Sequence, residues 1–388
     1  MLEWSLRQPN VEVSAVCDVS EERATHAQAL VEKASGRRPI PYTRGPEDYK
    51  RMLDRDDLDA VVIMTPQNQH ARQAIDAMLA GKHVGSETPP AYTIEQCWEL
   101  VETKLKTGRH YMLLENYPYS REHMMVLNMA YKGAFGTLTY GESSYIHDTR
   151  DLLFEKTGAL SWRGEVAHAN RGDNYPTHAL APLSLWMGIN RGDRLVSIVS
   201  MDTGNESLRN YAREHFGKDH PAAQEGFFAR RDTTITLAHT ALDRLLVLRY
   251  DPGANRPAGG WEALQGTRGG YDGTPRGGLL YLQGRSPDHK WEPLEKYREE
   301  FEHPYWKQDG AEATAAGHGG GDYFVMREFY RAVADDREPP IDVFDAATWS
   351  SFLPLSAQSI KAGFKAVDVP DFTRGAWKNR TMTGFGLT

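Results

Sequence analysis

The chain has 388 residues, which is too long for one ordinary hydrophobic core and suits two domains that share an interface. Hydrophobic residues make up 40% and charged residues 25%, no apolar run approaches the roughly 20 residues of a membrane helix, and the charge of -8 comes from interspersed acids and bases. We therefore predict a globular protein that neither spans a membrane nor binds nucleic acid, whose two cysteines, Cys17 and Cys97, form no disulfide framework and lie in the core.

The first third of the chain alternates strand-like and helix-like patterns. Four runs have strand character, and a helical pattern follows each: VEVSAVC at 11–17, AVVIM at 60–64, HVGSE at 83–87 and YMLLEN at 111–116. Ser20, followed by two acids, is typical of a helix start, and Thr93 with Gln96 predicts a capping box. This alternation predicts a Rossmann-like, doubly wound parallel sheet in a first domain over residues 1–118.

The pattern changes after residue 118. A helix is expected at 119–132, and four β-like segments follow: TLTYGESSYI at 137–146, RLVSIVSM at 194–201, TTITLAHT at 233–240 and RLLVLRY at 244–250. Residues 253–290 are rich in glycine, proline and arginine and are expected to form long loops. Further helices are expected at 322–336 and 345–365. We predict an α/β plus α+β protein with a mixed-sheet second domain, 119–388, whose C-terminal helices pack back on the first domain.

The expected start of a dinucleotide-binding domain is absent from this sequence. Such a domain opens with a strand and a GxGxxG turn whose amides hold the pyrophosphate. Residues 1–8 instead resemble the end of the helix after that turn, and the run ending at Asp18 lies where the second strand belongs. We expect roughly twenty to thirty residues to precede Met1, with a domain that evolved without them as the alternative. Without the turn, we expect the chain to bind NAD weakly.

Two strand ends carry candidate cofactor ligands. Asp18 lies where a carboxylate accepts hydrogen bonds from the ribose hydroxyls of NAD and repels the 2′-phosphate of NADP. The alternative is that Asp18 caps the next helix. In the segment TPQNQH, Thr65, Pro66, Asn68 and His70 are expected to contact the diphosphate or the nicotinamide ribose, the alternative being a proline-initiated turn.

The motifs TPQNQH, AGKHVGSETP and LLEN, in this order at strand ends, resemble the glucose-fructose oxidoreductase-like (Gfo/Idh/MocA) dehydrogenases. In those enzymes a motif that reads EKP carries a lysine that assists hydride transfer. Here the motif is Glu87-Thr88-Pro89, and the missing ammonium counts against an ordinary reductase. The resemblance implies that Glu87, Glu115 and Asn116 contact NAD.

A second set of motifs resembles glycoside hydrolase family 109, the NAD-dependent N-acetylgalactosaminidases. These motifs are LLENYPYSREHMMVLNMAYKGAFG at 113–136, YIHD at 145–148, RGDNYPTHALAPLSLWMGINRGDR at 171–194, GHGGGDY at 317–323 and DAATWSSFLPLS at 345–356. NYPTHALAP is the most specific, and the similarity covers nearly all of the chain except its start and 253–290. That family also lacks the EKP lysine.

The resemblance implies a cycle in which NAD oxidises the sugar's 3-hydroxyl, the ketone acidifies the proton on carbon 2, and elimination expels the anomeric substituent. Water then adds and the hydride returns. His178 is expected to bind the sugar and to exchange a proton with the 3-hydroxyl. Tyr175, also a substrate ligand, or Tyr145 is expected to take the carbon 2 proton, although its phenol pKa must then be lowered. Glu115 is expected to orient the nicotinamide or a sugar hydroxyl.

Three other residues have candidate roles. His318, among the glycines of GHGGG, is expected in a loop that approaches the substrate closely. His147 and Asp148 would form a metal site with His318, but nothing fixes the required spacing, and we predict no metal. Trp162 is expected beside the cofactor or a sugar face, the alternative being core packing.

These motifs predict a glycosidase that removes N-acetylgalactosamine, or a related sugar, from a glycoconjugate. One alternative is an NAD(P)-dependent sugar oxidoreductase, against which Thr88 counts. Another is a non-catalytic sugar-binding relative with a decayed cofactor site, against which the retained tyrosines and His178 count. By analogy with the superfamily we expect a homodimer. The compartment stays open between bacterial cytoplasm and periplasm, the latter if the preceding residues hold a twin-arginine signal.

Overall fold

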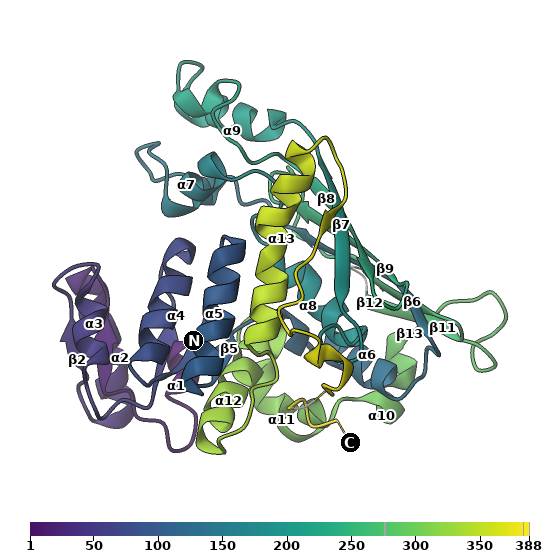
Figure 1. Ribbon diagram of the computed structural model, residues 1–388, viewed down its shortest axis with the longest axis horizontal. Helices are drawn as coiled ribbons and strands as arrows, with labels where there is room; N and C mark the ends of the chain where they lie inside the picture. The colour runs from purple at the N-terminus through teal and green to yellow at the C-terminus, as the bar shows by residue number, and fades with distance from the viewer. Residues whose placement is uncertain (275–276, 383, 388) are drawn as a thin grey trace.

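The computed structural model describes residues 1–274, 277–382 and 384–387. Figure 1 shows the short strands and helices of the N-terminal third on one side and a long sheet on the other, with the C-terminal helix α13 (Val343–Lys361) running between them. The two parts therefore meet along α13.

Short parallel strands alternate with helices as far as Leu113. The strands are β1 (Ala15–Cys17), β2 (Ile40–Tyr42), β3 (Ala60–Ile63), β4 (His83–Ser86) and β5 (Tyr111–Leu113). β1 pairs with β2, while β3, β4 and β5 form a three-stranded sheet in that order. Among the described strands, β1 and β3 are not hydrogen-bonded to each other. The alternation of parallel strands and helices confirms the Rossmann-like class, here divided between two sheets.

Two helices of this region begin where the sequence predicts, after Ser20 and after Thr93, whereas the short helix Asp48–Leu53 was not predicted. The helices of the region are α1 (Leu2–Ser5), α2 (Glu21–Ser35), α3 (Asp48–Leu53), α4 (His70–Leu79) and α5 (Ile94–Thr107). The Ser20 hydroxyl caps α2, and the Thr93 hydroxyl accepts a hydrogen bond from the Gln96 amide at 3.2 Å. The reciprocal half of the expected capping box differs, because Gln96 Oε1 accepts from the Tyr92 amide instead, at 2.8 Å.

The two cysteines have different surroundings. Cys97, on α5, is fully buried, as predicted. Cys17 is exposed, so the prediction of core packing is wrong there. Its strand, β1, pairs only with β2 among the described strands, and the end of such an edge strand is covered on fewer sides than the end of a central one.

The remainder of the chain surrounds a nine-stranded sheet. In spatial order the strands are β13 (Glu292–Pro293), β12 (Gly277–Leu282), β11 (Gly269–Thr274), β10 (Glu262–Gly266), β6 (Leu138–Ile146), β9 (Leu245–Asp251), β8 (Thr234–Thr240), β7 (Leu195–Asp202) and β14 (Val367–Asp368). β6 and β9 pair in parallel, and the other neighbours pair antiparallel. The predicted mixed sheet and its four predicted strands are confirmed.

The stretch 253–290 is not the set of long loops that its composition predicts. β10, β11 and β12 form an antiparallel meander within it, although residues 275–276 lie outside the described residues. Its glycines permit close contacts between neighbouring segments of the chain. A Cβ atom at Gly269 would lie 2.7 Å from the Tyr281 carbonyl oxygen, and one at Gly266 would meet the Phe135 carbonyl. Glycine is depleted in ordinary strands, which is why composition misled the prediction.

The helices of this part cover one face of the large sheet and its ends. They are α6 (Arg121–Tyr131), α7 (Trp162–Ala169), α8 (Thr177–Trp186), α9 (Glu206–Phe216), α10 (Arg298–Phe301), α11 (Pro304–Thr314), α12 (Gly321–Ala334) and α13. The helices predicted at 119–132, 322–336 and 345–365 are confirmed as α6, α12 and α13. α13 packs against both α5 and β7. The division of the chain at residue 118 stays a prediction.

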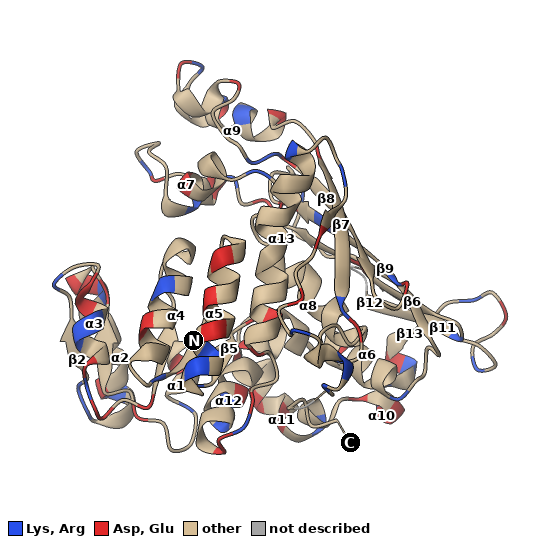
Figure 2. Cartoon of the chain, viewed as in Figure 1, with Lys and Arg blue, Asp and Glu red and all other residues tan. Residues whose placement is uncertain are grey.

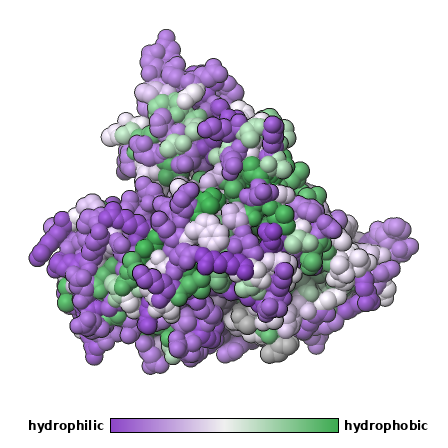
Figure 3. Space-filling view, viewed as in Figure 1, coloured by the Kyte–Doolittle hydropathy of each residue, from purple (hydrophilic) through white to green (hydrophobic). Residues whose placement is uncertain are grey.

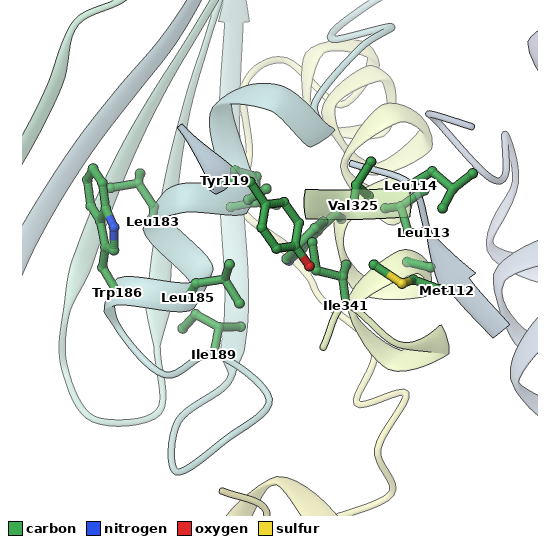
Figure 4. Packing of buried hydrophobic residues seen from close by; sticks show 14 of the residues in the cluster. Met112, Leu113, Leu114, Tyr119, Leu183, Leu185, Trp186, Ile189, Val325 and Ile341 are labelled. Atoms are coloured by element: carbon green, nitrogen blue, oxygen red, sulfur yellow. The ribbon is translucent and has the colours of Figure 1, made fainter. Parts of the chain in front are cut away.

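A continuous apolar core joins the two parts of the molecule. Figure 4 shows the Tyr119 ring between side chains from β5, including Met112, and side chains from α8, including Leu185. Tyr119 is fully buried, and the Trp186 indole donates a hydrogen bond to the His123 carbonyl at 3.0 Å. This packing holds the carboxyl end of β5 and α8 in a fixed relation.

A smaller apolar cluster lies apart from this core. Its buried members, here called the satellite cluster, are Leu153, Ala167, Leu208, Ala212, Ala222, Ala223 and Phe228. They come from the segments around α7 and α9, which Figure 1 shows at the top of the view, away from the parallel strands. The satellite cluster therefore stabilises the segments around α7 and α9, which lie apart from the parallel strands.

Surface charge and helix length complete the description. Figure 2 shows lysine and arginine interspersed with aspartate and glutamate over the helices. Within the described ranges, no helix combines the length and apolar character needed to cross a membrane.

Candidate active site

A pocket of about 580 Å³ lies where the carboxyl end of β6, the start of α8 and the satellite cluster approach one another. Its polar lining comes from segments far apart in the sequence: Gln67, Tyr117, Ser144, Tyr145, His147, Thr149, Arg163, Asn174, Tyr175, His178, Arg230, Tyr250 and His318. Three of these, Tyr145, Tyr175 and His178, are the predicted catalytic residues. The structure brings them together, while their roles stay predictions.

His178, in the first turn of α8, forms a pair with Glu115. Its Nδ1 lies 2.8 and 2.9 Å from the two carboxylate oxygens, and the Glu115 side chain has no exposed surface. Burial alone would raise the pKa of Glu115, but the His178 charge and the hydrogen bonds from His178 and from the Tyr117 amide hold that pKa below its ordinary value. The carboxylate accepts from Nδ1 and leaves Nε2 as the free ring nitrogen.

Three tyrosine rings surround His178. Tyr117 stacks on the imidazole, with ring centroids 5.4 Å apart and planes 7° from parallel. Tyr145 and Tyr175 meet it edge-on at 5.5 and 4.8 Å. The hydroxyl of Tyr117 donates to Glu262 at 3.0 Å, which fixes the stacked ring. Sequence reasoning missed Tyr117, although it directly follows the LLEN motif that supplies Glu115.

The phenols of Tyr145 and Tyr175 differ in their partners. Burial raises the pKa of both, so both are protonated at neutral pH. The Tyr145 oxygen lies 3.2 Å from Nδ1 of His147. The Tyr175 oxygen lies 2.6 Å from the hydroxyl of Thr88. Tyr145 thus has a neighbouring imidazole that can receive its proton, whereas Tyr175 has a neutral hydroxyl.

The parallel pairing of β6 and β9 adds Tyr250 to the pocket. In this register Tyr145 lies opposite Tyr250, and their ring centroids are 6.2 Å apart. Side chains directly opposite in a sheet share a face, here the one that carries α8. A Cβ atom at Gly141 on that face would lie 2.8 Å from Leu183 of α8, so glycine permits the close approach of the helix. Nothing local in the sequence marks Tyr250.

The carboxyl ends of β4 and β5 provide candidate ligands for the nicotinamide end of the cofactor. Burial raises the pKa of Glu87, and the charge of Glu115 adds to this effect. Asn116 donates from Nδ2 to Asp322 at 2.7 Å, whereas its buried Oδ1 has no partner within the described chain. A buried carbonyl oxygen without a donor fits an amide such as the nicotinamide carboxamide. These residues are therefore compatible with NAD.

The TPQNQH residues show mainly structural contacts. The buried His70 ring has Nε2 2.8 Å from the Thr65 carbonyl and Nδ1 3.0 Å from the Pro89 carbonyl. The ring joins the loops after β3 and β4, and it is not among the pocket-lining residues. Pro66 precedes the 3-10 turn Gln67–Gln69, and Asn68 in that turn is exposed. Their predicted cofactor contacts stay predictions.

Asp18 has one engaged and one free oxygen. Its Oδ1 accepts a hydrogen bond from the Ser20 amide at 2.8 Å, as in the capping alternative. Its Oδ2 has no partner among the described residues, and the side chain is 34% exposed. Capping and ribose binding are therefore compatible, because each uses a different oxygen.

His318 lines the pocket and Trp162 does not. Nδ1 of His318 lies 3.0 Å from Asp322 Oδ1, and this contact raises the pKa of His318. The Trp162 ring lies beneath the Arg163 guanidinium at 4.1 Å, and it is Arg163 that faces the pocket. In the part of the chain that the structure describes, no three histidine, cysteine, aspartate or glutamate side chains gather as metal ligands.

Two family models match most of the chain. The model for the glycosyl hydrolase 109 C-terminal domain matches residues 119–379, and that for the oxidoreductase family NAD-binding Rossmann fold matches residues 1–114. The second match confirms the predicted NAD-binding domain.

Relatives and solved structures agree with these matches. A glycosyl hydrolase family 109 protein of Saccharopolyspora erythraea is 39% identical over 379 residues, which are 97% of this chain and 81% of the relative. An alpha-N-acetylgalactosaminidase of Shewanella oneidensis is 36% identical over 380 residues, 96% of this chain and 82% of the relative. A levoglucosan dehydrogenase in complex with NADH and L-sorbose is 19% identical, with a TM-score of 0.73 over 92% of this chain and 90% of that one. The last likeness is one of fold.

Proposed function

The chain belongs to glycosyl hydrolase family 109, and on this basis we propose that it is an NAD-dependent glycosidase that removes N-acetylgalactosamine, or a closely related sugar, from a glycoconjugate. The name of the Shewanella relative supports the sugar. The observation that carries the proposal is the meeting of the His178–Glu115 pair with Tyr145 and Tyr175 in one pocket.

The cofactor provides the redox chemistry. When bound, NAD supplies an acceptor for the hydride on carbon 3 of the sugar and later returns that hydride. Glu87, Glu115 and Asn116 at the strand ends would hold its nicotinamide end, and the free oxygen of Asp18 would accept from its ribose. Thr88, in place of the dehydrogenase lysine, disfavours a reductase that releases reduced cofactor.

His178 is assigned the proton of the 3-hydroxyl. Its Nδ1 is held by Glu115, so Nε2 is the nitrogen that accepts the proton. The ionised carboxylate then stabilises the imidazolium, in the way a buried acid supports histidine in other hydrolases. Glu115 therefore acts through His178 rather than on the sugar itself.

Tyr145 is assigned the proton on carbon 2. The pKa of this phenol is raised by burial rather than lowered as its predicted role requires, so Tyr145 acts as a base only if its own proton passes to a neighbouring acceptor. The His147 imidazole, 3.2 Å from the Tyr145 oxygen, provides that acceptor. Tyr175 is paired with Thr88 and is assigned to positioning the sugar.

An isotope experiment tests this mechanism. The NAD-loaded protein is given an aryl N-acetylgalactosaminide deuterated at carbon 2. The label should exchange with solvent or slow the cleavage, and reduced cofactor should not accumulate, because proton removal from carbon 2 precedes loss of the aryl group. Full retention of deuterium without an isotope effect would refute the mechanism even if the glycoside is cleaved. Stoichiometric release of NADH would indicate a sugar oxidoreductase.

Two variants serve as internal comparisons. His178→Ala should abolish both cleavage and label exchange. Trp162 lies outside the pocket lining and supports the Arg163 guanidinium from beneath. Trp162→Ala should therefore mainly raise KM, while the carbon 2 deuterium still exchanges with solvent.

The predicted homodimer is also part of the proposal. Exposed apolar side chains lie on strands of the large sheet: Met201, Ile235, Leu237 and Leu245. Figure 3 shows apolar surface where α13 and β7 lie. Such a surface favours pairing of two copies. Light scattering should give twice the chain mass of 43.7 kDa, and the single mass would contradict the dimer.

A further inference from the structure

One buried arginine in the described chain differs from the others. The arginines less than a tenth exposed are Arg150, Arg191, Arg230 and Arg327. Three of them have carboxylate partners: Arg150 with Asp148, Arg191 with Asp345 and Arg327 with Glu328. Arg230, which is 4% exposed, has no ion pair among the described residues, and its Nε and Nη2 have no hydrogen-bond partner. The buried guanidinium therefore has no carboxylate of the described chain in direct contact with it.

Arg230 lines the same pocket as His178. Its backbone amide donates to the Ala167 carbonyl at 2.9 Å, which fixes it against α7. Burial raises the pKa of the Tyr250 phenol, and the charge of Arg230 and its side-chain hydrogen bond with Tyr250 oppose that rise, so the guanidinium contacts Tyr250. Tyr250 stacks with Tyr145, which in turn meets His178. Arg230 is thus linked to His178 through the contacts of Tyr250 and Tyr145.

The acid nearest in sequence is engaged elsewhere. The two carboxylate oxygens of Asp232 accept hydrogen bonds from the amides of Ser207 and Leu208, at 2.8 and 3.1 Å, where α9 begins. Among the described residues that line the pocket there is no aspartate or glutamate, whereas Arg163 and Arg230 both contribute guanidinium groups. The described pocket lining therefore carries positive charge and no carboxylate, and the Asp232 carboxylate, whose pKa burial raises against the opposing charge of Arg230, is held by the α9 amides rather than by the guanidinium.

A guanidinium removed from water is stable only when anions or several acceptors surround it. The edge formed by Nε and Nη2 is the one with which Arg171 holds both oxygens of Asp202, at 2.7 and 2.9 Å. Two oxygens of one anionic group match this edge in spacing and direction. Because both nitrogens of Arg230 are shielded from solvent, binding requires the guanidinium to turn toward the pocket.

We propose that Arg230 forms an anion subsite, which binds a carboxylate or sulfate group carried by the glycoside at carbon 6 or on its leaving group. This inference rests on the proposed glycosidase function and narrows its substrate class to acidic glycoconjugates. The anion would pair with Arg230 while His178 and Tyr145 act on the sugar ring.

Binding measurements on the NAD-loaded full chain test the subsite. The three probes are phenyl N-acetylgalactosaminide, its 6-sulfate, and the 4-carboxyphenyl glycoside of the same sugar. At least one anionic probe should bind on the order of tenfold tighter than the neutral one, as expected for a charge-assisted hydrogen bond. The difference should shrink as salt is added. The preferred probe distinguishes a sulfated sugar from an acidic leaving group.

Two variants assign the effect to one residue. Arg230→Gln should abolish the preference, whereas Arg231→Gln, at the adjacent position outside the pocket lining, should retain it. Equal affinity of the unmodified protein for all three probes would overturn the subsite and leave the glycosidase proposal standing. That comparison needs no variant, so it decides even if Arg230→Gln fails to fold. Anion preference without any cleavage would instead count against the glycosidase proposal alone.

Discussion

The hydroxyl of Thr88 lies 2.6 Å from the phenol oxygen of Tyr175. The position that carries a lysine in the similar dehydrogenases thus holds a buried side chain in direct contact with Tyr175, which lines the pocket. A threonine hydroxyl orients a phenol, but it carries no charge and does not exchange its proton near neutral pH. Acid and base chemistry is therefore left to the imidazole and phenol groups of the pocket.

Replacing Thr88 tests the value of this contact. Thr88→Val keeps the shape but leaves the buried Tyr175 hydroxyl without its partner, so kcat/KM should fall about tenfold, the effect of roughly 1.4 kcal/mol. Thr88→Ser keeps the hydroxyl and should retain most of the activity. Steady-state kinetics with an aryl glycoside measure both, and an unchanged valine variant would show that the contact does not support catalysis.

The charge of Glu115 should control the pH dependence of activity. Because its pKa is held below the ordinary value of 4.5, the ionised form and the stability it contributes persist above that pH and are lost only as pH falls through the lowered value. Glu115→Gln keeps an acceptor for His178 but removes the charge, and kcat should fall on the order of 10²-fold or more. The rate profile from pH 5 to 9 should also shift.

Glu262→Gln is the matched control for that experiment. Glu262 accepts from Tyr117 and is not bonded to His178, so its loss should leave the pH profile in place. Equal shifts in both variants would mean that the effect comes from general loss of buried charge rather than from the imidazole.

Asp173 should make stability depend on pH. It is buried, and burial raises its pKa from 3.8 to about 7. Its contribution is therefore fully present below pH 3.8 and is lost as pH rises through 7, a total of roughly 4 kcal/mol. Asp173→Asn keeps the acceptor for the Tyr175 amide and should remove this fall. Urea unfolding at pH 4, 5, 6 and 7 compares the two proteins, and parallel curves would contradict the prediction.

Asp18 should select the cofactor. With Oδ1 engaged by Ser20, Oδ2 accepts from the ribose and repels a 2′-phosphate, so titration calorimetry should show tighter binding of NAD than of NADP. Asp18→Asn keeps a capping oxygen and should reduce the preference by about tenfold or more, because the repulsion is lost. Equal affinity of the unmodified protein for both nucleotides would refute the ribose role.

The sequence predicted the strands and helices whose signals lie within a few neighbouring residues. Strand runs ending at Asp18 and at Thr65 and the helix starts at Ser20 and Thr93 lie where they were expected, because periodicity and caps act over a few residues. The meander of β10 to β12 was missed for the opposite reason. In that meander, glycine permits a close approach between neighbouring strands, for example at Gly269. A short stretch of sequence does not show which strands will become neighbours.

The candidate site divides in the same way. The sequence predicted that Tyr145, Tyr175 and His178 share a site because each lies in a motif with a family resemblance, and all three line the pocket. Tyr250 and Arg230 carry no such signal, since one reaches the pocket through strand pairing and the other through its contact with α7. Trp162 lies outside the pocket lining, which its neighbour Arg163 joins, and its predicted contact with the cofactor or a sugar stays a prediction.

The pairing of Tyr145 with Tyr250 makes the protein sensitive to changes of chain length. Side chains alternate between the two faces of a strand, so a residue inserted inside β9 would turn Tyr250 to the opposite face. A residue inserted at Asp243, in the turn before β9, would leave the β6–β9 register intact. Insertions and deletions should therefore preserve activity in that turn and abolish it when they fall within β9. A selection for activity among random length variants of this segment would reveal the difference.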